Sequence, residues 1–376
     1  MPDSPAAWLL TAARRRVLDR LRAEAVAARK EPLLLVESGL QQRSRAPRAD
    51  PGDLVGDERL RLVLLCCHPA LSVESSSALS LRLVIGLTTA DIARLFLAQE
   101  SAVAARITRA KRKIVTAGMP FALPDAGHLG ERVERVADVA YLAVTAGYVP
   151  GPGADLFRAD LAGEAVRLLS VTRELAGSSL LVDSQLALMM LHHARRDARV
   201  GPGGAGLVLL PDQDRSRWHH GEIARALSLL APQLTDPPPG RAGARLLEAL
   251  IAAEHAVARR AADTRWDRIA DAYSRLEART GSPVVRLNRA VAVAETTGPE
   301  AGLALLEGLD GELPGSHRLA AVRAELLLRA GAYERARAAY DEAVRLCANA
   351  VERRHLEQRR ELTGGTSPGS ARAGGR

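Results

Sequence analysis

The residues of this chain that are best suited to bind an anion stand close together between positions 106 and 113. Arg106 and Arg109 are three positions apart, so a helix places both on the same face. Lys111, Arg112 and Lys113 follow directly. An arginine guanidinium can donate two parallel hydrogen bonds to a guanine edge, and a lysine ammonium is suited to a phosphate. This spacing predicts a basic helix face with the chemistry of nucleic-acid binding.

Two helices separated by a short break are predicted to position this basic face. Residues 88–91 (TTAD) have the hydroxyls and the carboxylate typical of a helix N-terminus. Residues 99–101 (QES) open the second helix, and apolar residues then recur along it at spacings of three and four: Val103, Ile107, Ala110 and Ile114. A recognition helix that enters a major groove has such an apolar stripe on one side and a basic face on the other.

The same pattern also fits an ordinary amphipathic helix pair whose basic face is only solvated. Ala93, ten residues before Val103, favours the DNA-binding interpretation, because a small residue there lets the two helices cross closely. Leu97 departs from the simple pattern, since it occupies the turn position where helix-turn-helix units often have glycine.

Composition predicts an all-α protein. The chain of 376 residues has few aromatic residues (3%) and is dominated by Ala, Leu, Val and Arg, which favours many short helices over a sheet. Its formal net charge of +8 makes an anionic partner plausible. A GC-rich genome also enriches Arg and Ala, so the clustering of the charge is more informative than its total.

Candidate metal and catalytic residues do not form a convincing set in the sequence. Cys66 and Cys67 precede His68, but a packed helix explains them better than a metal, because no second Cys/His pair stands at ligand spacing. The His192-His193 and His219-His220 pairs could ligate a metal only if the fold brought them together. For residues 212–218 (DQDRSRW), a loop-to-helix cap with Asp/Arg pairing is preferred over a metal or catalytic site. We therefore expect no enzyme activity, no cofactor and no metal.

Cysteine usage and hydropathy indicate the compartment. Three cysteines make no disulfide framework, and no apolar run approaches the roughly 18–20 residues that span a bilayer. No secretory signal peptide is recognisable at the N-terminus. The sequence therefore predicts a cytoplasmic protein.

The last third contains a faint repeat. Residues 331–346 (GAYERARAAYDEAVRL) match the second helix of a tetratricopeptide repeat, and Gly298, 33 residues before Gly331, begins a weaker copy. Stacked helix pairs of this kind form a concave surface for a peptide or protein. A purely structural helical layer is the alternative.

Several stretches together resemble RNA polymerase sigma factors of the extracytoplasmic-function type, in the subgroup with a long helical C-terminal extension. They are SPAAWLLTAARRRVLDRLR, DERLRLVLLCCHPAL, LSLRLVIGLTTADIARLFLAQESAVAARITRAKRKI, LALMMLHHARRDARV, LLPDQDRSRW and SPVVRLNRAVAVAE. The resemblance implies a remnant of sigma region 2 (1–24), a flexible linker (25–56), the helix-turn-helix of sigma region 4 (57–117), a helical extension (118–265), TPR-like repeats (266–362) and a disordered tail (363–376).

In such sigma factors the first domain binds core polymerase and melts the −10 element, and region 4 recognises the −35 element. In the family, tens of residues precede the segment SPAAW and make the main contact with core polymerase. We therefore expect either a gene start placed too late or a real loss of that contact.

The resemblance implies roles for individual residues. Positions expected to face bases or nearby phosphates are Gln99, Glu100, Ser101, Ala102, Ala105, Arg106 and Arg109. Positions expected to contact phosphates are Thr88, Thr89, Lys111, Arg112 and Lys113. In the region 2 remnant, Asp3 and Ser4 would end the loop that recognises the −10 element, and Arg14, Arg15 and Arg16 would lie along the −10 strand.

Two functions follow from these expectations. The first is a sigma factor whose partners are core RNA polymerase, promoter DNA and, through the C-terminal repeats, a regulatory protein or another part of the chain. The second is a helical-repeat interaction scaffold, or a non-specific nucleic-acid-binding protein, without sigma activity.

Overall fold

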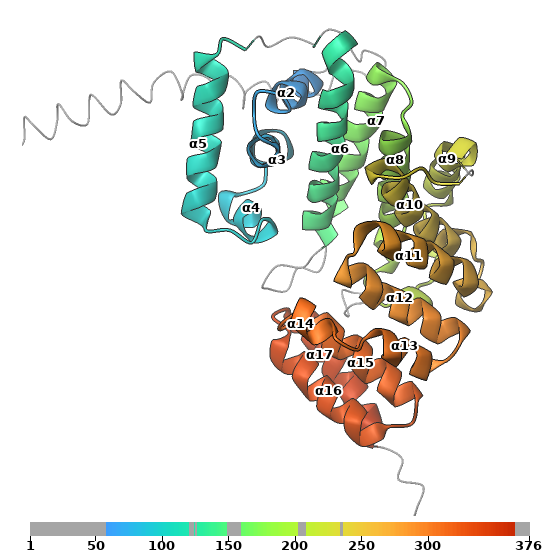
Figure 1. Ribbon diagram of the computed structural model, residues 1–376. Coiled ribbons are helices and arrows are strands. Elements are labelled where there is room, and N and C mark those ends of the chain that lie inside the picture. Colours follow the sequence, from blue (N-terminus) through green and yellow to red (C-terminus); the bar gives the residue numbers. More distant parts are fainter. Residues whose placement is uncertain are drawn as a thin grey trace, which may run out of the picture. The chain divides into compact units, whose positions relative to one another are not determined.

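A computed structural model describes residues 58–119, 124, 126–148, 159–201, 208–233 and 236–364. All regular elements in these ranges are helical, which confirms the predicted all-α class (Figure 1). The predicted region 1–24, with Asp3, Ser4, Arg14, Arg15 and Arg16, and the linker 25–56 lie outside the described residues, as do residues 365–376 of the tail. The chain divides into two units, residues 1–139 and 140–376, and each is described by itself.

The described residues of the first unit form four helices and the beginning of a fifth. They are α2 (Glu58–Cys66), α3 (Val73–Ser80), α4 (Thr89–Leu95), α5 (Glu100–Thr116) and the start of α6 (Ala126–Tyr148). A π-helical turn, Leu81–Ile85, continues α3. Helix α5 packs against both α3 and α4, and fully buried leucines such as Leu60, Leu64 and Leu79 fill the core.

Helix α2 is shorter than the sequence suggests, because it ends at Cys66 and not at Leu71. His68 precedes Pro69, and a residue before proline avoids the helical conformation. Cys66 is the last residue of the helix and Cys67 follows it, so the predicted helix covers only the first cysteine, although both are fully buried in the core. Burial raises the pKa of the Cys67 thiol to about 12, and both thiols are therefore protonated at neutral pH.

The break between α3 and α4 occurs where the sequence predicts it. Gly86 has a φ of 83°, in the left-handed region that favours glycine. The Thr88 hydroxyl then accepts a hydrogen bond from the Asp91 amide at 3.0 Å and donates one to the Asp91 carboxylate at 2.7 Å. This reciprocal cap starts α4.

The first half of α6 belongs to the first unit, although the sequence places a domain boundary at residue 117. The Arg135 guanidinium donates to the Leu71 carbonyl at 2.8 Å, and that of Arg132 donates to the Leu64 carbonyl at 3.3 Å. These carbonyls lie in α2 and the turn after it, where helical acceptors need outside donors. Arginines beyond the predicted boundary therefore help to complete this unit.

The second unit is built from consecutive helices. They are α7 (Ala159–Ala176), α8 (Leu180–His193), α9 (His220–Leu230), α10 (Arg241–Val257), α11 (Trp266–Thr280), α12 (Pro283–Thr296), α13 (Pro299–Leu305), α14 (Leu309–Glu312), α15 (His317–Arg329), α16 (Tyr333–Leu346) and α17 (Ala350–Glu361). Helix α8 is central, since all of its residues from Leu181 to Leu191 are buried. A 3-10 turn, Leu210–Asp212, precedes α9.

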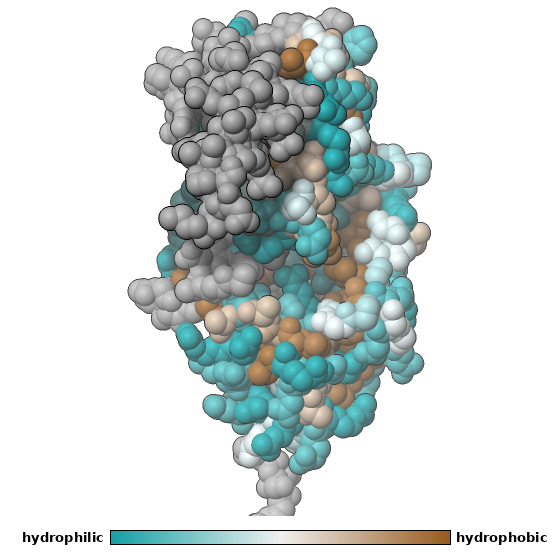
Figure 2. Space-filling model, turned by 90° about the vertical axis from the view of Figure 1, so that its left-hand side faces the viewer, coloured by the Kyte–Doolittle hydropathy of each residue, from teal (hydrophilic) through white to brown (hydrophobic). Residues whose placement is uncertain are grey.

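The C-terminal helices pack in sequential pairs, α11 on α12 and α15 on α16. The two glycines of the predicted repeat, Gly298 and Gly331, both have a positive φ and both come just before a helix. Ala336, Tyr340 and Ala343 face the core, as the repeat pattern requires. The assignment to tetratricopeptide repeats stays a prediction. Figure 2 shows mainly hydrophilic residues over these helices, with smaller hydrophobic areas between them.

None of the described helices is long and apolar enough to cross a membrane.

The turn between α4 and α5 stores strain at Leu97. This residue has a φ of 50°, which L-residues other than glycine, asparagine and aspartate rarely adopt, and its side chain is 96% exposed. The strain is not offset by burial of the leucine side chain.

We expect Leu97→Gly to raise the free energy of unfolding by roughly 1 kcal/mol, because glycine removes the Cβ clash of the left-handed conformation. Urea denaturation of the full chain measures this gain. Leu97→Ala is the matched control, since alanine keeps the Cβ and should gain nothing. An equal gain in both variants would contradict the strain argument.

Candidate functional site

The outward surface of α5 presents most of the residues expected to contact bases. Gln99, Glu100, Ser101, Ala102 and Arg109 are exposed, and Ala105 and Arg106 are half-buried. Val103, Ile107, Ala110 and Ile114 are buried on the opposite side, as their spacing predicts. The N-terminal half of α5 and its cap therefore form one continuous exposed surface on which polar side chains and alanines alternate.

Arg106 lies within electrostatic reach of Glu74 at the start of α3. Hydrogen bonds from its own backbone amide and from Ser72 lower the pKa of the Glu74 carboxyl, and the charge of Arg106 lowers it further. Arg106 is also half-buried. Arg109, one turn further along α5 and exposed, is the better placed of the two to contact a ligand.

The basic cluster at the end of α5 is divided by the helix. Lys111 is 7% exposed, because it follows Ile107 by four residues and so shares the buried face. The expectation that it contacts a phosphate is corrected by this placement. Lys113 is exposed but donates a hydrogen bond to the Ala70 carbonyl. Arg112 is exposed on the outer side.

Thr88 and Thr89, the other residues expected to contact phosphates, begin α4. The Thr88 hydroxyl is engaged in the cap with Asp91, and Thr89 is half-buried. Arg94, one turn along the same helix, forms an ion pair with Asp91. The start of α4 therefore offers only a limited polar surface.

A polar network in the second unit joins the ends of α8 and α9. The Arg196 guanidinium donates to the Glu222 carboxylate at 2.8 Å and lies 3.1 Å from His219 Nδ1. His193 Nδ1 contacts the same carboxylate at 2.8 Å, and His219 Nε2 lies 2.7 Å from the Asp197 carboxylate. The fold thus brings His193 and His219 together around a guanidinium. Such a cation does not allow a metal between the two rings.

The network includes acidic residues that the sequence did not single out, Asp197 and Glu222. Glu222 stands in the first turn of α9 with no motif around it, and only its proximity to His193 in space reveals its role. No spacing signal links residues 26 to 29 positions apart.

The segment 212–218 has a structural role. The Asp214 carboxylate accepts from the Ser216 amide at 3.0 Å and from its hydroxyl at 2.6 Å, so the predicted cap is confirmed. The Arg215 guanidinium stacks 4.4 Å from the Trp218 ring centroid and donates to the His255 and Ala258 carbonyls at 2.7 and 2.8 Å. It therefore holds the end of α10, in place of the expected Asp/Arg pairing.

A groove of about 690 Å³ lies beside this segment within the second unit. Its wall combines aromatic rings, aliphatic side chains and a few polar groups, contributed by Leu209, Leu210, Pro211, Arg215, His255, Trp266, Tyr273, Asn288, Val291 and Glu295, among others. Asn288, Val291 and Glu295 share one face of α12. A concave surface with this mixture of groups is suited to a peptide or a small ligand.

Comparison with known proteins finds family matches to two segments of the chain. The family model described as Sigma-70, region 4 matches residues 61–114, which extend from α2 nearly to the end of α5. A family model of unknown function matches residues 132–234. An uncharacterised protein of Rhizobium meliloti (strain 1021) is 39% identical over 356 residues, which are 94% of this chain and 83% of that protein. No solved structure matches the chain.

Two histidines beside the polar network titrate abnormally. Burial, together with the charge of the nearby Arg195 guanidinium, lowers the pKa of His192 to about 3 and that of His255 to about 4. Each ring is therefore neutral in the folded chain and gains a proton when the chain unfolds in mild acid.

We expect the free energy of unfolding to fall as the pH drops from about 6.5 towards 4, because only the unfolded state binds these protons. His192→Gln should remove the part of this dependence that His192 contributes, about 3 kcal/mol between pH 7 and pH 4. Urea denaturation at several pH values tests this. His220→Gln is the control, since His220 is exposed. An unchanged pH dependence in His192→Gln would refute the assignment.

Proposed function

Since the chain belongs to the extracytoplasmic-function type of RNA polymerase sigma factors, in the subgroup with a helical C-terminal extension, we propose that it directs polymerase to specific promoters. In this proposal α5 recognises the −35 element. The second unit regulates initiation. The region 4 match supports the DNA-binding role, and the exposed polar surface of α5, fixed by its buried stripe, is the observation on which the proposal rests.

The proposal gives each exposed group on α5 a contact that suits its chemistry. Arg109 would donate to a guanine edge, and Glu100 would accept from a cytosine amino group. Arg106 would contact a base or a phosphate while it remains near Glu74. Gln99, Ser101, Ala102 and Ala105 complete the surface and allow close approach to the groove.

Phosphate contacts are proposed at both ends of the helix-turn-helix. Arg112 is exposed near the end of α5, and Lys113 could exchange its bond with the Ala70 carbonyl for a phosphate. Thr88 and Thr89 stand at the start of α4 and are proposed as further phosphate contacts through their hydroxyls. These contacts would position the protein without selecting a sequence.

The remaining partners follow from the family. A sigma factor binds core RNA polymerase, and we propose the same partner for this chain. The residues proposed to contact DNA near the −10 element are Asp3, Ser4, Arg14, Arg15 and Arg16. It also places the protein in the cytoplasm, where polymerase acts, and assigns it no catalytic step of its own.

We expect Arg109→Ala to reduce discrimination between the preferred −35 sequence and a mismatched one by about 1–3 kcal/mol, because one bidentate base contact is lost. The preferred sequence is first selected from a random DNA library with the full chain. Titration of matched and mismatched duplexes then gives the ratio of affinities.

Arg112→Ala is the matched control for this experiment. Loss of a phosphate contact should weaken binding to all duplexes equally and reduce the salt dependence by about one unit of slope. If Arg109→Ala behaves in the same way as Arg112→Ala, the basic face binds DNA without recognising sequence, and the −35 role fails.

Sigma activity itself is tested by run-off transcription with purified core polymerase and the selected promoter. The chain is assayed beside a version extended upstream in the same reading frame. If neither initiates, the interaction-scaffold hypothesis moves to first place. The groove beside segment 212–218 is the observation that favours that second candidate.

Regulation by the second unit is expected to depend on the same groove. Val291→Arg should change promoter-specific initiation at least about threefold, a free-energy change of roughly 0.7 kcal/mol, while the affinity of the protein for −35 DNA stays the same. Val284→Arg is the control, because Val284 is on the same helix, 50% exposed and outside the groove lining.

A truncation complements this test, and the structure determines where it should end. A chain that ends at Tyr148 keeps the hydrogen bonds of Arg132 and Arg135 to the carbonyls of α2 and the turn after it. A chain that ends at residue 121 loses both arginines. If initiation is unchanged both in the truncated chain and in Val291→Arg, the second unit has no regulatory role.

A further inference from the structure

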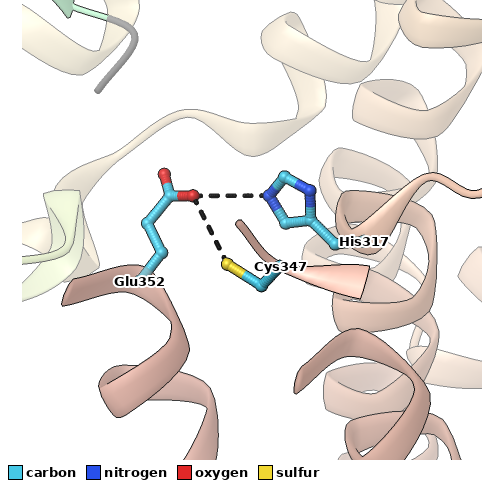
Figure 3. Close-up of side chains that lie close together, drawn as sticks. All are labelled: His317, Cys347 and Glu352. Carbon is cyan, nitrogen blue, oxygen red and sulfur yellow. Dashed lines mark hydrogen bonds and ion pairs between the residues drawn. The ribbon is translucent and has the colours of Figure 1, made fainter. Parts of the chain in front are cut away.

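Three potential metal ligands converge where α15, α16 and α17 meet. His317 is the first residue of α15, Cys347 directly follows α16, and Glu352 lies in the first turn of α17. His317 Nε2 is 3.4 Å from Glu352 Oε2, and Cys347 Sγ is 3.9 Å from the same oxygen. The three ligand atoms all lie within 4.8 Å of one another, and the side chains point toward one another (Figure 3).

These separations are close to those of a tetrahedral zinc site. Zinc binds imidazole nitrogen and carboxylate oxygen at about 2.0–2.2 Å and thiolate sulfur at about 2.3 Å. Tetrahedral angles then separate the ligand atoms by roughly 3.3–3.6 Å. Binding of a metal would therefore change the His317–Glu352 and Cys347–Glu352 ligand-atom separations by only a few tenths of an ångström. The side chains already face one another (Figure 3).

The backbone around the cysteine is held firmly. The Arg353 guanidinium donates twice to the Cys347 carbonyl, at 2.6 and 3.1 Å. The Asn349 side-chain oxygen accepts from the Val351 and Glu352 amides at 2.9 and 3.0 Å. Side chains that are not themselves ligands thus fix the loop from α16 to α17. Groups around metal sites usually hold the ligands in place in this way.

Burial and charge also suit a divalent cation. Cys347 is 1% exposed and packs beside Tyr340, Ala343 and Leu356. The side chains of His317 and Glu352 are 30% and 22% exposed, so solvent can reach the cluster from one side. A thiolate and a carboxylate together balance the charge of a divalent ion, which limits the cost of burying it.

We propose that His317 Nε2, Cys347 Sγ and a Glu352 carboxylate oxygen bind one Zn²⁺ ion, with water in the fourth position. Mixed sulfur and nitrogen ligands favour zinc over magnesium or calcium, which prefer oxygen. Binding replaces the proton of the Cys347 thiol by the metal, and the proton passes to solvent. The ion would tie together three helices at the C-terminal end of the second unit.

The competing explanation is a set of hydrogen bonds without metal. In that case the Cys347 thiol donates to the Asn349 carbonyl, 3.5 Å away, and His317 only pairs with Glu352. The two explanations differ in whether a thiolate forms a bond to a metal, and a spectroscopic probe can detect that bond.

The experiment titrates the metal-free full chain with Co²⁺ and follows the thiolate-to-cobalt charge-transfer band, and then displaces Co²⁺ with Zn²⁺. We expect one equivalent to bind. Cys347→Ser should abolish the band, and His317→Gln should weaken binding at least about tenfold. His355→Gln is the control, since His355 is on α17 but outside the cluster.

The ligand variants are expected to fold, because serine preserves the volume of cysteine and His317 is partly exposed. Far-ultraviolet circular dichroism checks this. The proposal is overturned if no charge-transfer band appears at saturating Co²⁺, if the band persists in Cys347→Ser, or if His317→Gln binds as tightly as the unmodified chain. None of these measurements depends on DNA binding or transcription.

Discussion

The burial of one face of α5 is the constraint on which the proposed DNA-binding surface depends. Val103, Ile107, Ala110 and Ile114 remove their apolar area from water against the rest of the first unit, and this fixes the rotation of α5 about its axis. Arg109 and Arg112 then remain outside, whereas Lys111 is turned inside. A rotation of α5 that exposed Lys111 would also expose the apolar stripe to water. The hydrophobic effect therefore opposes this rotation.

Several arginines of this protein donate hydrogen bonds to its own backbone. Arg135 donates to a carbonyl after α2, Arg215 to carbonyls at the end of α10, and Arg353 to the carbonyl that follows α16. The last carbonyls of a helix have no partner within it, and the several donors of a guanidinium can satisfy them at a distance. A high arginine content can therefore serve to stabilise the fold. Exposed arginines such as Arg109 are the ones that indicate an anionic partner.

Helix ends also determine where polar groups gather in the second unit. The network of His193, Arg196 and Glu222 joins the end of α8 to the start of α9, and the cluster of His317, Cys347 and Glu352 joins the ends of three helices. In helices that pack side by side, the faces in contact are apolar, so polar side chains gather on the outward faces and at the helix ends. Sites in such a protein are accordingly expected at the ends of helix pairs or in the groove between them.

The sequence by itself determined the helical class, the starts of α4 and α5 and the buried stripe, because these depend on local periodicity and caps, and it showed that Leu97 stands where glycine is usual. The placement of Lys111 was also determined by its spacing from Ile107, although the charge of the residue obscured it. Only the tertiary structure decided that Arg132 and Arg135 complete the first unit, that a guanidinium separates His193 from His219, and that Cys347 meets His317. These contacts join residues that are distant along the chain, and the packing of whole helices, which no local pattern specifies, brings them together.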